Sequence, residues 1–324
     1  MKLITTYFIA ACLIFGAGLS QPLSAVAQST VPDSPTSQTD SARSAKDSSA
    51  TTRHANARVY KVNYWISGAI IVAGLGSGLL TPALHKDTIS NAELANAQAN
   101  PDNVPAFDRI SLHQDISLVP TYDNYSTYLQ EATILAPLTL LIDEDVRKQW
   151  IDVLMVGLEV NAVVLAIYTY SPIGPLFQDR YRPLVYYSPA VAKQYGIYQE
   201  DGNNKNSFYS GHVASASAGM FFVAKVLDDF HPELGNNRYW LYAGAAVPSL
   251  AMCYFRLKTL DHFPTDILTG LTIGTACGIL IPELHRIGDK DMSLGVYSSP
   301  YGTGLKLRWT MASANEIPSA IPQN

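Results

Sequence analysis

The chain has 324 residues, of which 48% are hydrophobic and only 15% are charged. An ordinary soluble domain has about 25% charged residues, so this composition favours a membrane protein or an unusually apolar helical protein. The formal net charge is -5, which gives no basic surface for nucleic acid, and we expect no nucleic-acid partner. The three cysteines, Cys12, Cys253 and Cys277, are too few and too scattered for a disulfide framework or a thiolate metal site.

The N-terminus has the pattern of an export signal. Lys2 is followed by a mainly apolar stretch over residues 3–19, and Ala25-Val26-Ala27 forms a small-x-small cleavage site before Gln28. We therefore predict a signal peptide over residues 1–27. Two alternatives are an uncleaved anchor helix and a lipoprotein signal, because Ile9-Ala10-Ala11-Cys12 resembles a lipobox.

Residues 28–58 are predicted to be a disordered linker outside the cytoplasm. Half of the 24 residues from Ser29 to Thr52 are Ser or Thr, and they show no apolar periodicity. Such a segment buries too little apolar surface to offset the entropy lost on ordering.

Residues 59–288 form one apolar body and are predicted to be a single helical domain. Its apolar stretches are long enough for helices rather than strands, and they lie near the lower limit of about 17–25 residues for crossing a bilayer. Tyr and Trp cluster at their ends, as at a membrane interface. The stretches cover residues 64–84, 128–142, 151–170, 213–226, 239–255 and 267–282. We predict an all-α bundle embedded in a membrane, with a soluble periplasmic bundle as the alternative.

The tail, residues 289–324, changes character. Leu305, Leu307 and Trp309 alternate with polar residues, and Leu294 and Val296 do the same before a turn-like stretch at 298–302. This period of two predicts a short C-terminal β-hairpin.

The candidate chemistry begins with Ser210-Gly211-His212, directly before an apolar stretch. Ser210 is a favourable N-cap, and the free N–H groups at the start of a helix form an anion site that Gly211 allows a ligand to approach closely. His212 would lie at the rim of that site, able to donate a proton.

A second group of candidate residues precedes the last apolar stretch. Pro264 suits the first turn of a helix, so His262 lies just before that helix and Asp266 lies inside its first turn. A carboxylate there could accept from one imidazole nitrogen and leave the other free to attack an electrophile. Arg256, six residues before His262, offers a bidentate fork for phosphate-like oxygens.

With Arg182-Pro183 upstream, these stretches resemble the three motifs of the type 2 phosphatidic acid phosphatase superfamily, which includes class A acid phosphatases and vanadium haloperoxidases. The family pattern is Lys-x6-Arg-Pro, then Pro-Ser-Gly-His, then Ser-Arg-x5-His-x3-Asp. Here Tyr209 replaces the proline of the second motif and Phe255 replaces the serine of the third. The resemblance covers about residues 128–288 and implies an all-helical core with the motifs at one end.

The resemblance implies a hydrolase of phosphate monoesters or diphosphates that uses no metal and no cofactor. It implies that His262 forms a phosphohistidine, that Asp266 orients His262, and that His212 protonates the leaving oxygen. Arg182, Arg256 and the Ser210-Gly211 backbone would bind the phosphate oxygens. The expected substrate is a lipid phosphate, lipid diphosphate or polyprenyl diphosphate. A vanadium haloperoxidase and a degenerate, non-enzymatic member that binds lipid phosphate remain alternatives.

One departure concerns the lysine of the first motif, because Pro175 occupies its position. Arg180 or Lys205 is the candidate substitute, and we include Arg180 among the expected phosphate-binding residues. We interpret Asp261 as a loop carboxylate rather than as a second orienting group.

The expected location is the inner membrane of a bacterial-type envelope, with membrane lipid as a neighbour and the active site facing the periplasm. A cleaved signal leaves the chain outside the cytoplasm, so an even number of crossings must precede Arg182. The stretches 128–142 and 151–170 supply two, and their connection holds Arg147 and Lys148, which suits the inside. We therefore expect residues 64–84 not to cross. The alternative is that residues 64–84 cross and that 128–142, the shortest stretch, fails to span.

Overall fold

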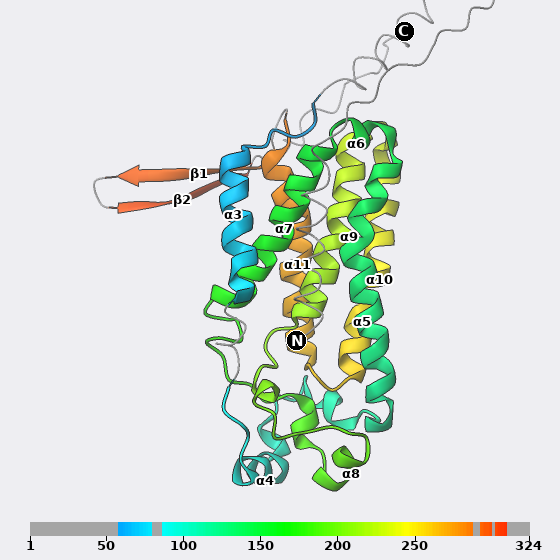
Figure 1. Ribbon diagram of the computed structural model, residues 1–324, viewed down its shortest axis with the longest axis vertical. Helices are drawn as coiled ribbons and strands as arrows, with labels where there is room; N and C mark the ends of the chain where they lie inside the picture. Colours follow the sequence, from blue (N-terminus) through cyan, green and yellow to red (C-terminus); the bar gives the residue numbers. More distant parts are fainter. Residues whose placement is uncertain (1–57, 80–85, 288–291, 300–301, 310–324) are drawn as a thin grey trace, which may run out of the picture. The chain divides into compact units, whose positions relative to one another are not determined.

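The computed structural model describes residues 58–79, 86–287, 292–299 and 302–309. The predicted signal peptide and nearly all of the predicted linker lie outside these described residues. The described part contains six longer helices that run along one another (Figure 1). They are α3 (Tyr64–Gly76), α5 (Val119–Leu135), α7 (Trp150–Tyr170), α9 (Gly211–Phe230), α10 (Arg238–Lys258) and α11 (Pro264–His285). The predicted helical bundle is confirmed.

Helix α9 is the central element of this bundle, because it packs against α5, α7, α10 and α11. Most of its buried side chains are small or apolar, and Val213, Ala214, Ala218 and Phe222 are at most 1% exposed. Helices α7 and α11 are long and apolar enough to cross a membrane, and only 39% and 44% of their apolar windows are buried in the protein.

Two predicted helices have different bounds in the structure. Helix α3 ends at Gly76, well before residue 84. The stretch 128–142 is divided: α5 begins at Val119 and ends at Leu135, and a 3-10 helix, η5 (Ala136–Ile142), follows. Pro137 lies at the start of η5, and a proline cannot donate the backbone hydrogen bond that would continue the α-helix. The apolar pattern is continuous there, so it gave no sign of this change.

A line of glycines brings α11 into close contact with α9. A Cβ atom at Gly270 would lie 2.4 Å from the carbonyl oxygen of Ser210. At Gly274 it would lie 2.1 Å from that of Ala214, and at Gly278 2.6 Å from that of Ala218. Small residues at four-residue spacing are typical of closely packed membrane helices. This contact sets the beginning of α9 beside the beginning of α11.

Helix α3 lies parallel to α7 along almost its whole length. At one end the Tyr64 hydroxyl donates to the Asp152 carboxylate at 2.5 Å, and at the other the Thr169 hydroxyl lies 3.3 Å from the Ser77 hydroxyl. Between them, a Cβ atom at Gly74 would lie 2.3 Å from the carbonyl oxygen of Ala162. Helix α3 therefore reaches the same two ends of the bundle as α7.

Short elements form a cap at one end of the bundle, where α4 and α8 lie in Figure 1. The cap has its own apolar core, in which Ile89, Leu94, Val185 and Leu260 are buried. Its elements are α4 (Asn91–Ala99), η2 (Pro101–Asn103), η3 (Arg109–His113), η4 (Ile116–Leu118), η6 (Pro183–Tyr186), α8 (Pro189–Gln194) and η7 (Gly202–Lys205). At the opposite end are α6 (Glu144–Lys148) and η8 (Pro232–Asn237).

The tail contains two strands, β1 (Met292–Ser299) and β2 (Gly302–Trp309). They pair antiparallel, with Met292 opposite Trp309 and Ser299 opposite Gly302. Among the described residues, β1 and β2 form a two-stranded sheet.

Candidate active site

The candidate residues come together where α9 and α11 begin, at the cap end of the bundle. Ser210 precedes α9, and its N–H donates to the backbone carbonyl of Asp266 in the first turn of α11 at 3.2 Å. Gly270, one turn further along α11, lies against the Ser210 carbonyl. The close packing of the two helices thus joins two motifs that are more than fifty residues apart in sequence.

His262 is held in one tautomer by a backbone carbonyl. Its Nδ1 lies 2.6 Å from the Ser207 carbonyl oxygen, and because a carbonyl can only accept, Nδ1 must carry the proton. The Nε2 atom then keeps its lone pair. The ring is 3% exposed, and burial together with the nearby Arg256 and Arg182 guanidinium groups lowers the pKa of His262 well below 6.5. A neutral imidazole with a free Nε2 is the form that can act as a nucleophile.

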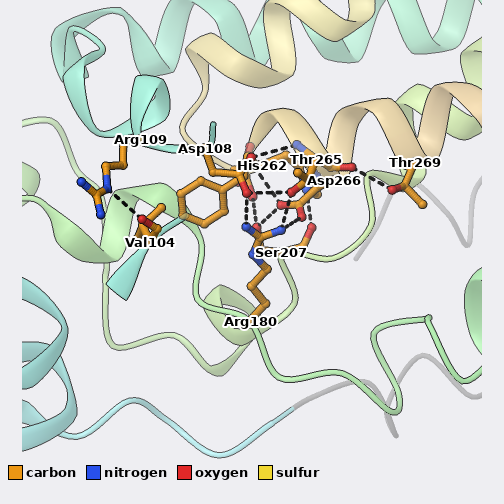
Figure 2. A network of polar contacts seen from close by, with 11 residues as sticks. Val104, Asp108, Arg109, Arg180, Ser207, His262, Thr265, Asp266 and Thr269 are labelled. Carbon is orange, nitrogen blue, oxygen red and sulfur yellow. Dashed lines mark hydrogen bonds and ion pairs between the residues drawn. The ribbon is translucent and has the colours of Figure 1, made fainter. Parts of the chain in front are cut away.

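Asp266 does not make the direct hydrogen bond to His262 that we expected. Its carboxylate accepts from the Ser207 hydroxyl at 2.6 Å, from the Phe263 N–H at 2.8 Å and from Arg180. The expectation that Asp266 itself accepts from His262 is therefore wrong: the imidazole is held by the carbonyl of Ser207, and Asp266 holds the hydroxyl of the same residue (Figure 2). The sequence spacing placed Asp266 near His262 but did not show that the first turn of α11 directs this carboxylate to Ser207.

Arg180 belongs to the same polar network. One of its terminal nitrogens contacts Asp266 and the Thr265 hydroxyl, and the other lies 2.7 Å from the Asp108 carboxylate (Figure 2). Its guanidinium group also lies 4.4 Å from the centre of the Phe263 ring. Arg180 is thus bound to two buried carboxylates, and the structure gives it a bracing position rather than the phosphate-binding position that we expected.

Asp108 is part of this network although the sequence gave no signal for it. Its side chain is 1% exposed and accepts from the backbone N–H of Thr265 at 3.0 Å and from the Thr265 hydroxyl at 2.8 Å. It therefore ties the cap to the first turn of α11. No motif surrounds Asp108, and the residues it contacts are more than seventy positions away.

Arg182 and Arg256 meet, as expected, beside His262. Arg182 donates to one oxygen of the Asp261 carboxylate, and Arg256 lies 2.6 Å from the other. Asp261 lies in the loop between α10 and α11, and Nδ1 of His262 contacts Ser207 instead, but this carboxylate is 8% exposed and joins both arginines, which the sequence did not indicate. The two guanidinium groups lower the pKa of Asp261 well below its ordinary value. The Nε atoms of both arginines are buried and have no hydrogen-bond partner among the described residues.

The start of α9 offers further donors for an anion. The Ser210 side chain is fully buried and does not cap the helix, and its hydroxyl has no partner among the described residues. The position of Gly211 is set by Tyr168, whose ring would lie 3.1 Å from a Cβ atom there. His212, half-buried in the first turn, makes no hydrogen bond to any described residue and is electrostatically coupled to Arg256, Asp261 and Arg182.

Lys205, the second candidate substitute for the missing lysine, lies 3.2 Å from the Glu93 carboxylate. Its backbone carbonyl accepts from the Arg180 N–H at 2.9 Å. Pro175 is buried, in a tight turn after α7. The charge of the missing lysine is therefore not replaced by Lys205, which is paired within the cap. Among the described residues, no three His, Cys, Asp or Glu side chains gather as metal ligands.

Residues 154–287 match the family model of the PAP2 superfamily. This part of the chain, which holds all the candidate residues, belongs to that superfamily and has its helical architecture.

A comparison with curated proteins and one with solved structures add little to this assignment. No curated protein matches the chain. Among solved structures, the chain is similar to a transmembrane PAP2 type phosphatidylglycerolphosphate phosphatase from Bacillus subtilis. The two are 15% identical with a TM-score of 0.37, and the match covers 66% of this chain and 93% of that one.

Proposed function

We propose that this protein is a metal-independent phosphatase that works through a phosphohistidine. Nε2 of His262 attacks phosphorus while the bond from phosphorus to the leaving oxygen breaks, and His212 gives that oxygen its proton. His212 then takes a proton from water, which attacks the phosphohistidine, releases phosphate and restores His262. Arg182, Arg256 and the backbone at Ser210-Gly211 stabilise the charge on the phosphate oxygens.

One observation carries this proposal: the Ser207 carbonyl orients a buried, neutral His262, whose Nε2 is free, beside donors that have no partner among the described residues. The arginine Nε atoms and the Ser210 hydroxyl are buried polar groups, and leaving them unpaired is costly. A phosphate group supplies the acceptors that they lack. Superfamily membership supports the same type of activity.

We further propose that the bundle lies in a membrane and that the substrate is a lipid phosphate, a lipid diphosphate or a polyprenyl diphosphate. The outer helices turn apolar side chains outward: Trp65 and Val72 of α3 are 90% and 73% exposed, and Trp240 and Val247 of α10 are 78% and 68% exposed. The inner face of α3 instead carries the buried Ser67 and Gly74, and the buried Ser77 follows the helix directly. Apolar outside and small or polar inside is the pattern of a helix solvated by lipid.

The test is phosphate release from a panel of lipid phosphates and diphosphates by the purified protein in detergent. We expect His262→Ala to abolish turnover and a rapid quench without acid to trap phosphate on His262 of the wild type. His113→Ala, at an exposed histidine of the cap, is the control and should keep the wild-type rate.

Three results would contradict the proposal. A near-normal rate for His262→Ala would reject the mechanism. A folded wild type that releases phosphate from no substrate would favour the non-enzymatic alternative. Halide-dependent consumption of peroxide with added vanadate would favour a haloperoxidase.

A further inference from the structure

The carboxylate of Asp261 lies between the two arginines that the proposed function assigns to phosphate. It is held in the loop between α10 and α11, where one oxygen accepts from Arg182 and the other lies 2.6 Å from Arg256. Arg256 also contacts the Ser126 hydroxyl at 3.1 Å and the exposed Asp123 carboxylate at 3.5 Å, both on α5. The site therefore carries its own negative charge before any ligand binds.

The charges around this carboxylate can be counted element by element. Arg182 in the cap and Arg256 in α10 contribute two positive charges, and Asp261 removes one of them. Arg180 is already offset by Asp266 and Asp108. Pro175 stands where the resembled pattern has a third cation.

Of the two histidines near Asp261, His262 adds no positive charge, and His212 holds the proton that the proposed function transfers to the leaving oxygen. His262 of its own loop and His212 of α9 are both within electrostatic reach of it, and His262 is neutral because it is buried beside the arginines. Asp123 of α5, 61% exposed, is screened by solvent. The three groups Arg182, Arg256 and Asp261 thus carry one net positive charge.

Asp261 does not saturate the arginines. Each guanidinium group has five N–H donors, and the buried Nε donors of Arg182 and Arg256 are free among the described contacts. A phosphate group can bind to these donors while Asp261 stays in place. The bound phosphate then lies close to the Asp261 carboxylate, so each additional negative charge on the phosphate is repelled.

We propose that Asp261 makes the site select a phosphate group that carries one negative charge over one that carries two. This inference rests on the proposed function, because it takes the site of Arg182 and Arg256 as the phosphate site. Asp261 remains ionised throughout the working pH range because both arginines stabilise its charge. The protonation state of the phosphate therefore decides how well it binds, and a phosphate monoester loses its second proton at about pH 6.

The experiment measures binding by calorimetry, without turnover, on the whole protein in detergent, with inorganic phosphate and sulfate as probes. Sulfate is a dianion at both about pH 6 and about pH 8, whereas phosphate changes from mainly monoanion to mainly dianion between them. We expect wild-type affinity for phosphate to fall with rising pH, approaching about tenfold per pH unit once the dianion dominates. Sulfate should bind weakly at both pH values.

Asp261→Asn keeps the shape of the side chain and removes its charge. We expect this variant to bind sulfate, and phosphate at about pH 8, at least about tenfold more tightly than wild type, with a flatter pH dependence. Asp261→Glu keeps the charge and should keep the discrimination. Asp123→Asn removes the exposed carboxylate near Arg256 and is the control, with affinities within about twofold of wild type.

The proposal is overturned if wild type binds phosphate equally well at both pH values, binds sulfate as tightly as phosphate at about pH 6, or binds neither probe. It is also overturned if folded Asp261→Asn gains no affinity. If Asp261→Asn does not fold, the wild-type comparison of the two probes still decides. A wild type that hydrolyses lipid phosphates but shows no charge discrimination rejects this inference alone. Charge-selective binding without any turnover rejects the hydrolase alone.

Discussion

Replacing Gly274 with alanine should damage both stability and activity, although Gly274 is not a candidate catalytic residue. A Cβ atom at this position would lie 2.1 Å from the carbonyl oxygen of Ala214, whereas ordinary contact begins at 3.4 Å, so α9 and α11 must separate by about 1.3 Å. The neighbouring atom is backbone, which cannot rotate away. Overpacking of this kind costs about 1–3 kcal/mol of unfolding free energy.

The same separation moves His262 away from the beginning of α9. Because a misplacement of about 1 Å can lower a rate about 100-fold, we expect Gly274→Ala to lose activity by roughly that factor. The assays are thermal unfolding in detergent and phosphate release from the best substrate of the panel.

Gly244→Ala on α10 is the matched control, since nothing lies within 4 Å of a Cβ atom there. It should leave the rate unchanged and stabilise the protein slightly, by about 0.4–1 kcal/mol. A Gly274→Ala protein with wild-type unfolding temperature and rate would refute the argument that close helix packing sets the geometry of the site.

Three further predictions concern protonation, the bracing network and topology. The pKa of His262 lies well below 6.5, and its neutral form attacks. The acid limb of kcat/KM, measured from low to neutral pH, should therefore lie below pH 6.5. An acid limb at or above pH 6.5 that is absent from the substrate's own titration would contradict this. Arg180→Ala leaves two buried carboxylates without their cation and should cost about 3–5 kcal/mol in denaturant unfolding. Lys148→Ala removes an exposed ion pair with Asp145 and should cost less than about 1 kcal/mol; equal effects would remove the bracing role. Asn203 and Glu144 are exposed and lie at opposite ends of the bundle. With a single cysteine at either position in a cysteine-free background, we expect an impermeant reagent to label only one of the two in intact cells. Labelling of both would reject a spanning bundle.

The topology experiment also tests a conflict between the sequence and the fold. We expected residues 64–84 not to cross the membrane, so that an exported N-terminus and an outward-facing site could coexist. In the structure α3 reaches the same ends of the bundle as α7, from Tyr64 at Asp152 to Ser77 near Thr169. If α7 crosses the membrane, α3 reaches the same depth in it. Residue 58 then lies at the end of the bundle opposite the candidate site. An exported residue 58 and an outward-facing site are then incompatible in a spanning bundle, and labelling at Asn203 decides which of them holds.

The sequence by itself determined the class of fold and the position of the candidate chemistry. Apolar stretches such as 151–170 predicted α7 to within one residue of its bounds, because the apolar surface of a helix is a local property of the chain. The motifs at Ser210-Gly211-His212 and His262–Asp266 were also local, because each is a short run of residues at the start of a helix.

Only the tertiary structure decided the partners of these residues. His262 is held by the carbonyl of Ser207, 55 positions away, and Arg180 is held by Asp108, 72 positions away. Asp261 joins Arg182 to Arg256 across the cap and α10. No local pattern encodes such contacts, because a backbone carbonyl has the same chemistry at every residue and a carboxylate pairs with whichever cation the packing brings within reach. The close packing of α11 on α9 at its glycines decided which groups met.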